Sequence, residues 1–484
     1  MIQPMRSPIL LVILAAVAVA ALAPYAQADI VTVAPPGSNV PDAVTDLDAL
    51  FATLPEGSVV QFTPGRYELL PKPYLEDLCG NCPEESTQVV ATVGLRITGR
   101  GIWLLGPIDG EAVIVTNAGY GLLFDDCRSC NMEGLTVTGG VRDSSANATD
   151  AGVVVKRSSV SITNCVIRDN IGDPAMVAKT VVGIMGIAGR EGSVMTIRNN
   201  SIIRNSWDGI GLYRHAQATI EGNLIDGIDL ARGRELGGGR GVGIGCTWNA
   251  FARITGNLIR HYWKGIGIFV DAQATVEENV VEHVATWGIS LWDAGSGRPT
   301  GNIRRNVIYD TGACGVSVVR TSPDSPPPGQ FVQNILVRTG QDPRYDSGEP
   351  YCFQTALARH AVPDNFPVSA NIHYLNRETR GDPGKEDVGR DDFRTRVKVV
   401  LEKLERWPRF AESDFQNDFI RPLREEAEAE ARAAAAVADS LRALADSLAA
   451  PEGTAVDSLV TPPPDSLEMA PADTSAAPDS TTGG

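Results

Sequence analysis

The sequence has little that would support a membrane-spanning, nucleic-acid-binding or metal-centred protein. Its longest apolar run, Ile9–Ala23, has fifteen residues, which is short for a membrane span. The 42 Lys and Arg are outnumbered by 59 Asp and Glu, which argues against nucleic acid or an anionic membrane as partner. Only five His occur, and no two lie at ligand spacing within one strand. We therefore predict no cofactor, leaving open a structural or catalytic calcium ion.

Residues 1–28 have the features of a targeting segment. Arg6 precedes the apolar run, and Ala26-Gln27-Ala28 is an A-x-A cleavage site. We predict a signal peptide over 1–28, with a retained anchor as the alternative. The rest of the chain has no other apolar stretch of membrane length, so we expect no span after cleavage. The expected location is periplasmic, cell-surface or secreted, and the oligomeric state is left open.

A short pattern recurs between Thr196 and Arg320. Five segments end in Asn (TIRNN, TIEGN, RITGN, TVEEN, NIRRN), and each is followed by a Gly-led apolar pair (GIGL, GVGI, GIGI, GISL, GVSV). Recurrence at about 20–35 residues is typical of repeat architectures. The apolar residues lie two apart, which is the strand period, and no helix-length segment separates them. We predict three short strands per repeat, stacked in parallel coils that each bury one apolar stripe.

The recurring Asn residues support the same architecture, because Asn tolerates left-handed backbone at a corner and stacked amides can form a ladder. The predicted members are Asn164, Asn200, Asn223, Asn257, Asn279, Asn306 and Asn334. The pattern resembles the right-handed parallel β-helix repeat of the pectin-lyase-like superfamily, over roughly Val31–Thr339. The resemblance implies an all-β solenoid, which we expect to have about eight to eleven coils.

The composition divides the chain further. After the signal peptide we expect an N-terminal cap and loop (29–93) with a helix at Asp42–Leu54, the β-helix (94–340), a C-terminal extension (341–424) with a helix at Asp391–Trp407, an Ala/Glu-rich helix (425–450) and a tail (451–484). The tail is rich in Pro, Ala, Ser, Thr and Asp and has no Lys or Arg. Such a composition cannot bury enough apolar surface to fold, so we predict a disordered acidic tail.

The eight cysteines include two C-x-x-C pairs, Cys79/Cys82 and Cys127/Cys130. Four such sulfurs can hold zinc, but the gap of 44 residues is long for a zinc ribbon, and an oxidising compartment favours disulfides. We predict the disulfides Cys79–Cys82 and Cys127–Cys130, with zinc or a redox function as alternatives. The remaining residues, Cys165, Cys246, Cys314 and Cys352, are expected to be buried as small apolar side chains.

Aligning the repeats on their Gly predicts outward columns of side chains. Gly211, Gly243, Gly267, Ser290 and Ser317 form a small-residue floor, and Tyr213, Gly245, Phe269, Trp292 and Val319 form the next column. Aromatic side chains in line suit the apolar faces of sugars. We predict substrate binding by Tyr213, Arg240, Phe269, Trp292 and Asp293, and catalysis by Asp208, His215, Lys264 and Asp271. The alternative is that the aromatics pack under a C-terminal helix and the charges are solvated turn residues.

These columns lead to a functional hypothesis: an exported protein that binds a polysaccharide or cell-surface glycan along an outward groove. If it is an enzyme, carboxylates would serve a glycoside hydrolase, whereas a base with cations would serve a polysaccharide lyase or epimerase. The G-H-G and R-I-K signatures of the superfamily's polygalacturonase-like members are absent, as is the arginine-and-proline signature of its pectate lyases.

Two other classes stay open. One is a non-catalytic carbohydrate-binding or cell-surface structural protein. The other is a periplasmic metal-delivery accessory protein, similar to the copper-delivery proteins of nitrous oxide reductase assembly. The second would need a cluster of His, Met or Cys ligands, which the sequence does not place together.

Overall fold

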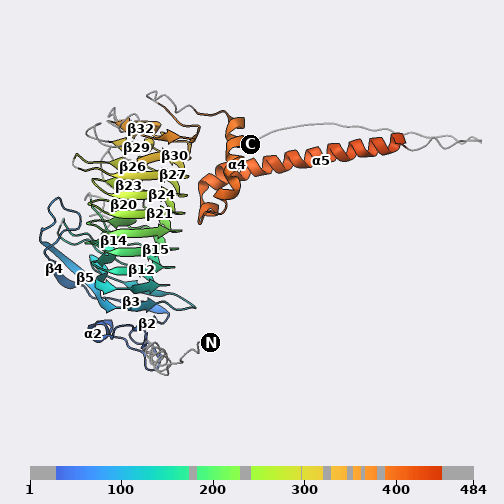
Figure 1. The fold of residues 1–484 in the computed structure, drawn as a ribbon. Helices are drawn as coiled ribbons and strands as arrows, with labels where there is room; N and C mark the ends of the chain where they lie inside the picture. Colours follow the sequence, from blue (N-terminus) through green and yellow to red (C-terminus); the bar gives the residue numbers. More distant parts are fainter. Residues whose placement is uncertain are drawn as a thin grey trace, which may run out of the picture. The chain divides into compact units, whose positions relative to one another are not determined.

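The computed structural model describes residues 29–145, 147–173, 182–228, 241–295, 297–319, 329–345, 353–360, 366–378 and 387–449. Within these residues, three sheets of twelve, eleven and eleven strands stack coil upon coil (Figure 1). Neighbouring strands pair in parallel except for one antiparallel pair, β4 with β5. The predicted all-β parallel β-helix is confirmed.

The three sheets are named A, B and C. Sheet A contains β1 (Ile30–Val33), β2 (Val59–Phe62), β6 (Trp103–Leu105), β9 (Cys130–Glu133), β12 (Ser159–Thr163), β15 (Val194–Arg198), β18 (Gln217–Glu221), β21 (Phe251–Thr255), β24 (Gln273–Glu277), β27 (Thr300–Arg304), β30 (Gly329–Val332) and β33 (Val368–Ser369). Sheet B contains β3 (Gly65–Glu68), β7 (Ala112–Val115), β10 (Thr136–Thr138), β13 (Val166–Arg168), β16 (Ser201–Ile203), β19 (Leu224–Asp226), β22 (Leu258–Arg260), β25 (Val280–Val284), β28 (Val307–Thr311), β31 (Ile335–Val337) and β34 (Ile372–Tyr374). Sheet C contains β4 (Lys72–Glu76), β5 (Val89–Arg100), β8 (Tyr120–Arg128), β11 (Ala151–Lys156), β14 (Met185–Arg190), β17 (Ile210–Leu212), β20 (Val242–Cys246), β23 (Lys264–Phe269), β26 (Trp287–Trp292), β29 (Cys314–Val319) and β32 (Thr355–His360).

The inward side chains of the repeat form the core. Alternate residues of a strand point to opposite faces, so one apolar residue per strand period faces the coil interior. In sheet A this stripe is Ile197, Ile220, Ile254, Val276 and Ile303, which stack in register and have no exposed surface. Burying each such side chain is worth about 1.5–3 kcal/mol relative to leaving it in water.

The predicted Asn ladder is present at the corner between sheets A and B. Each side-chain amide donates to the side-chain oxygen of the next coil at 2.9–3.1 Å, through Asn200, Asn223, Asn257, Asn279, Asn306, Asn334 and finally Asn371. The prediction that Asn164 is a seventh member of the ladder is wrong. Asn164 is exposed with φ 53° and donates to Glu133, whereas the amide of Cys165 meets Asn200 at 2.9 Å.

The solenoid extends beyond 94–340 at both ends. Strands β1 to β4 precede this range, and β32, β33 and β34 follow it. The N-terminal helix is shorter than predicted: α2 spans Leu47–Thr53, and the Asp46 side chain caps it by accepting from the Ala49 amide at 3.0 Å. Asp42 has a left-handed φ of 57°, which is incompatible with a helix that starts there.

The C-terminal extension packs on the outward face of sheet B. Its elements are η1 (Pro343–Tyr345), α4 (Arg390–Leu404), η2 (Phe410–Glu412) and the π-helical turn η3 (Gln416–Ile420). The predicted helix is confirmed as α4, with Phe393, Val397 and Leu404 buried. They join Val307 and Tyr309 of the solenoid in a second apolar cluster. This helix therefore covers sheet B. The alternative interpretation had placed it over the aromatic column of sheet C.

Three polar groups of sheet B hold the segment that precedes α5. Glu282 accepts the amides of Asp414 and Phe415 at 3.0–3.1 Å. The His283 ring lies between the carboxylates of Asp310 (2.8 Å) and Asp414 (3.0 Å). Since both ring nitrogens face carboxylates, the imidazolium form is the one that satisfies both contacts.

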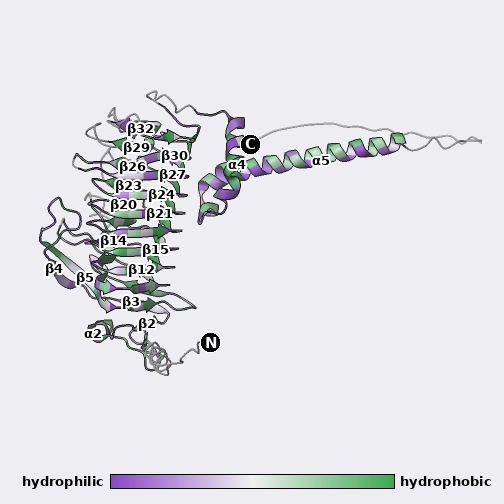
Figure 2. Cartoon of the chain, in the orientation of Figure 1, coloured by the Kyte–Doolittle hydropathy of each residue, from purple (hydrophilic) through white to green (hydrophobic). Residues whose placement is uncertain are grey.

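Residues from Arg424 onward form a separate unit, and its described part belongs to α5 (Arg421–Ala449). Figure 2 shows hydrophobic and hydrophilic residues interspersed along this helix, and none of its residues is buried. Among the described helices, none is long and apolar enough to cross a membrane. The predicted signal peptide and disordered tail lie outside the described residues.

The Asn ladder makes a first prediction. Asn257→Ala removes the acceptor of the Asn223 amide and the donor to the Ile220 carbonyl, and both groups are inside the corner. Each buried unsatisfied group costs about 1–3 kcal/mol, so for two groups we expect a loss of about 2–6 kcal/mol in the free energy of unfolding. Chemical denaturation measures it. The matched control is Asn302→Ala, at an exposed position of β27, and an equal loss in both variants would contradict the ladder's role.

The docking of the C-terminal segment makes a second prediction. Burial lowers the pKa of His283, but Asp310, Glu282 and Asp414 outweigh it and raise the pKa above its ordinary value. Arg338 faces Asp310 at 3.8 Å, Arg260 faces Glu282 at 3.7 Å, and the His261 ring stacks on His283. The stabilisation that charged His283 gives to the folded protein is therefore fully present below the pKa of this histidine in the unfolded chain. It is lost as the pH rises through its pKa in the folded protein.

We expect His283→Gln to lower the thermal midpoint by several degrees at pH 5.5 and by clearly less at pH 9. The control is His215→Gln, since His215 is exposed and shares the left-handed backbone, with φ 61° against 51° for His283. Thermal scans across this pH range measure the difference. An identical shift at both pH values would show that the charge of His283 contributes nothing.

Candidate functional site

A pocket of about 280 Å³ opens on the outward face of sheet C. Strands β20 and β23 supply lining residues, and the residues on either side of β17 supply others. The lining residues are Asn81, Trp207, Asp208, Tyr213, Gly241, Val242, Gly245, Cys246, Thr247, Trp263, Lys264 and Phe269. Four residues that the sequence analysis proposed as functional, Asp208, Tyr213, Lys264 and Phe269, thus meet in one place.

Asp208 is the buried ionisable group of this pocket, with 6% of its surface exposed. One carboxylate oxygen accepts the Val242 amide at 2.6 Å, and the other accepts the Tyr213 hydroxyl at 3.2 Å. Burial raises the pKa of Asp208 to about 6, against the opposing effects of these two donors and of Lys264. Burial and the Asp208 charge raise the pKa of Tyr213 well above its ordinary value. At neutral pH the pair therefore holds one proton, on Tyr213.

Aromatic rings and one cation form the pocket wall. The Lys264 ammonium lies 5.0 Å from the centre of the Trp287 ring and 5.7 Å from that of Phe269. Trp263 is buried, and Trp207 is partly buried. The ring faces hold the ammonium by cation–π attraction, which positions a positive charge at the edge of the pocket.

Packing explains part of the small-residue floor. A Cβ on Gly211 would lie 2.7 Å from the Tyr213 hydroxyl oxygen, and one on Gly267 would lie 2.3 Å from Phe269 Cζ. The rings two residues ahead fold back over these glycines, so packing itself requires them. At Gly245 the nearest atom, Asp208 Oδ2, would lie 3.5 Å away. Gly245 is therefore the floor glycine whose outward side is open to the pocket.

The coil that contains β20 is shifted by two residues from the predicted alignment of the repeats. Gly211 lies opposite Gly245, which lies opposite Gly267. The prediction that Gly243 belongs to this column is wrong. Gly occurs at every second position from 239 to 245, so the repeat pattern alone could not select the register. Val242, not Arg240, lies opposite Lys264. Arg240 lies outside the described residues.

The other predicted site residues do not line the pocket. Asp271 accepts the Asn249 amide at 2.7 Å, and Asp293 accepts the Gly295 amide at 3.1 Å, so both carboxylates hold turns. His215 is exposed on the turn after Tyr213. Trp292 lies edge-on to Trp287 with ring centres 6.3 Å apart. The pocket is therefore shorter than the predicted columns, which continue to Ser317 and Val319 on β29.

Sequence reasoning missed Asn81, which reaches the pocket from the loop before β5. Its side-chain oxygen accepts from the Trp248 indole at 3.1 Å. The two residues are 167 positions apart in the chain, and the repeat pattern does not extend to the loop. The C-x-x-C motif around Asn81 was the only available indication that this loop is ordered.

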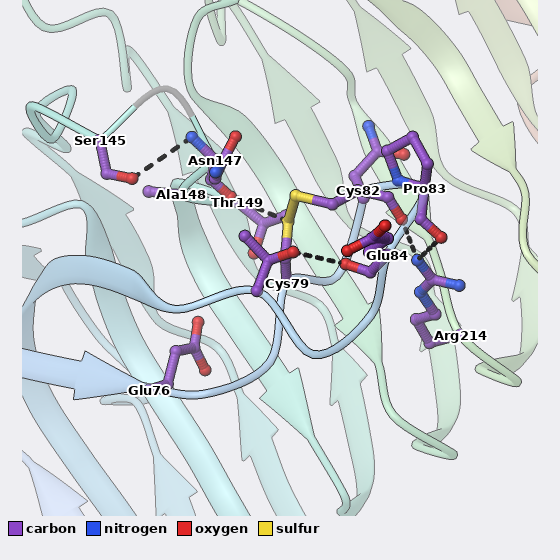
Figure 3. The surroundings of a disulfide bond; sticks show 12 residues. Glu76, Cys79, Cys82, Pro83, Glu84, Ser145, Asn147, Ala148, Thr149 and Arg214 are labelled. Atoms are coloured by element: carbon purple, nitrogen blue, oxygen red, sulfur yellow. Dashed lines mark hydrogen bonds between the residues drawn. A yellow bond between two sulfur atoms is a disulfide. The ribbon is translucent and has the colours of Figure 1, made fainter.

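One of the two predicted disulfides is confirmed. Cys79 and Cys82 are bonded (Figure 3). The other is wrong, since Cys127 and Cys130 are free and buried. They flank Ser129, whose left-handed φ of 55° turns the chain from sheet C into sheet A, and the Cys127 thiol donates to the Ile97 carbonyl at 3.1 Å. The zinc alternative is also wrong, because it needs all four sulfurs. As expected, Cys165, Cys246 and Cys314 are buried, while Cys352 lies outside the described residues.

One cluster brings candidate metal ligands together in the described part of the chain: Glu282, His283 and Asp414. Calcium prefers oxygen ligands, and this group offers two carboxylates. Glu282 already accepts two backbone amides and His283 pairs with two carboxylates. The structure therefore accounts for these side chains by the docking of the C-terminal segment.

No curated protein sequence matches this chain. Among solved structures, pectate lyase Pel9A is 14% identical over 75% of this chain and 82% of that chain, with a TM-score of 0.36. A lacto-N-biosidase from Eubacterium ramulus is 14% identical over 72% of this chain and 68% of that chain, with a TM-score of 0.40. PfbA, a surface adhesin of Streptococcus pneumoniae, is 9% identical over 69% of this chain and 74% of that chain, with a TM-score of 0.35.

The family described as "Right handed beta helix region" matches residues 101–236 and 185–341. These ranges contain the Asn ladder up to Asn334 and every pocket residue except Asn81. The match agrees with the three stacked parallel sheets and with the resemblance carried by the repeat. The chain is a right-handed parallel β-helix repeat protein.

Proposed function

We propose that this chain is an exported glycan-binding protein whose pocket on sheet C holds an acidic sugar. The observation that supports it most is the meeting of Asp208, Tyr213 and Lys264 within an aromatic-walled pocket of about 280 Å³. Export rests on the signal-peptide features of residues 1–28.

Each lining group has a role in such binding. The rings of Trp207 and Phe269, which are only partly buried, offer apolar surface to the faces of a pyranose. The Lys264 ammonium supplies the charge that a uronate carboxylate requires. Gly245 leaves the backbone of β20 open to a ligand from above. The Lys264 ammonium at the edge of the pocket attracts a carboxylate, which favours an acidic sugar over a neutral one.

The Asp208–Tyr213 pair adds a catalytic candidate, elimination across a uronate. Of the described residues that line the pocket, Asp208 is the only carboxylic acid, whereas hydrolysis uses two carboxylates. In the elimination, Tyr213 takes the proton on the carbon next to the uronate carboxylate and passes its own proton to Asp208. The electron pair of the broken C–H bond forms the C=C bond, and the glycosidic oxygen leaves with its bonding pair and takes a proton from water. Lys264 stabilises the charge that develops on the carboxylate.

Lys264→Ala is expected to weaken binding of a short oligouronide about 10- to 100-fold, which is about 1.4–2.7 kcal/mol. Isothermal titration calorimetry at low ionic strength measures it. The matched control is Lys398→Ala, an exposed lysine on α4 outside the pocket. Equal affinities for wild type and Lys264→Ala would remove the pocket from the binding reaction. Failure of wild type to bind any acidic or neutral glycan would refute the proposal.

The elimination predicts a pH dependence. Burial raises the pKa of Asp208 to about 6, and the carboxylate must be ionised to accept the Tyr213 proton. We therefore expect kcat/KM to rise with pH, with an inflection near pH 6, and Asp208→Asn to abolish it. The appearance of unsaturated uronide, followed by ultraviolet absorbance, is the measurement. If binding persists while no unsaturated product forms at any pH, the protein is a binding module without this activity.

A further inference from the structure

We propose that the pocket receives the end of a glycan chain, not its interior, and that Asn81 is a specificity-determining residue which contacts the terminal sugar. This inference rests on the proposed glycan-binding function. It comes from how sheet C is covered on the N-terminal side of the pocket and from the loop that carries Asn81.

The floor column of the pocket continues in register into the earlier coils, where it is covered. Leu123, Val154 and Ala188 pair in that order across β8, β11 and β14, and Ala188 lies opposite Gly211. All three point outward, on the face opposite the coil interior, yet none has exposed surface. They belong to an apolar cluster with Cys79, Cys82 and Ala148. A polymer cannot lie along this part of sheet C, because protein already fills it.

The next outward column is closed as well. Asp125, Lys156 and Arg190 pair across the same three strands and are at most 3% exposed. The Lys156 ammonium lies 2.6 Å from the Glu76 carboxylate, and the Arg190 guanidinium pairs with the same carboxylate. Glu76 ends β4, directly before the loop 77–88. These buried ion pairs therefore fix the base of the loop on the sheet.

Contacts from Arg214 and Trp248 hold the loop against the pocket. The Cys79–Cys82 disulfide closes the loop, and the Arg214 guanidinium donates to the carbonyls of Cys82 and Pro83 (Figure 3). Arg214 also stacks on the Trp248 ring at 4.7 Å, and Trp248 donates to Asn81. A Cβ on Gly80 would lie 2.9 Å from Arg190 Cδ, so the loop lies directly on the sheet.

Asn81 thereby becomes the end wall of the pocket. Its carbonyl oxygen is engaged by Trp248, while its amide nitrogen makes no hydrogen bond within the described residues, and the residue is exposed. A fixed amide donor beside aromatic rings is suited to a sugar hydroxyl or ring oxygen.

On the side of the pocket away from Asn81, Trp263 and Trp287 pack with Phe353 in a buried cluster. The volume of about 280 Å³ lies at the low end for ligand sites, which suits a terminal unit.

The stoichiometry of binding tests this inference. Oligouronides of increasing length and the parent polyuronide are titrated into the full-length protein by isothermal titration calorimetry. We expect the number of protein molecules bound per glycan chain to stay constant as the chain lengthens, because each chain has one end of the required kind. A number that rises in proportion to chain length would overturn the inference and leave the proposed function intact. Absence of binding at every length would refute both.

Asn81 has its own test. Asn81→Ala is expected to weaken the affinity for the shortest binding oligouronide about 10-fold, with an unchanged thermal midpoint, because the residue is exposed. Asn302→Ala, at an exposed position of sheet A, is the matched control. An unchanged affinity would remove Asn81 as a ligand contact.

The double variant Cys79→Ser with Cys82→Ser tests whether the loop 77–88, which carries Asn81, closes the end of the pocket. Without the disulfide we expect the loop to leave the sheet more readily, so that longer chains bind more than one protein each. Hydrogen exchange of residues 77–88 reports whether the loop has loosened. If exchange increases but stoichiometry stays at one protein per chain, the loop is not what restricts binding to chain ends.

Discussion

The in-register stacking of one coil on the next is the constraint on which this structure depends. A parallel coil leaves backbone N–H and C=O groups at its corners. At the corner between sheets A and B the Asn ladder satisfies them with one side chain per turn of the solenoid. Because the ladder repeats at one position, it also holds the register of the strands on either side. Residues separated by more than twenty positions in sequence are thereby fixed as neighbours in adjacent coils, and the pocket is built from such neighbours.

The same stacking creates outward columns, and apolar ones must be covered. On sheet B the outward column includes Leu258, Val280 and Val307, and α4 with the segment before α5 covers it. On the N-terminal coils of sheet C, the loop 77–88 covers Leu123, Val154 and Ala188. The pocket lies where the N-terminal cover ends, at Tyr213 and Asn81. Its position is set as much by what the chain covers elsewhere as by the residues that line it.

The repeat predicts whatever obeys the repeat. Ladder members from Asn200 to Asn334 and the inward stripe of sheet A follow directly from spacing, as does the gathering of Asp208, Tyr213 and Lys264. Predictions failed where local geometry or distant segments intervene. Cys127 and Cys130 flank a corner whose backbone no spacing rule describes, and Gly243 was misplaced because several glycines satisfy the pattern equally. Asn81 was out of reach, since its contact with Trp248 spans 167 positions between a loop and a coil.

In Asp208, burial under the neighbouring coil and a raised pKa are connected. A carboxylate with 6% of its surface exposed is costly unless donors satisfy it, and the Val242 amide and Tyr213 hydroxyl do so. The first of these contacts ties the start of β20 to the preceding coil, which is a structural role. The burial that makes the tie necessary also raises the pKa of Asp208 to about 6. A residue that the Val242 amide holds in place for the register of the solenoid therefore also has a raised pKa, and the proposed elimination draws on that property.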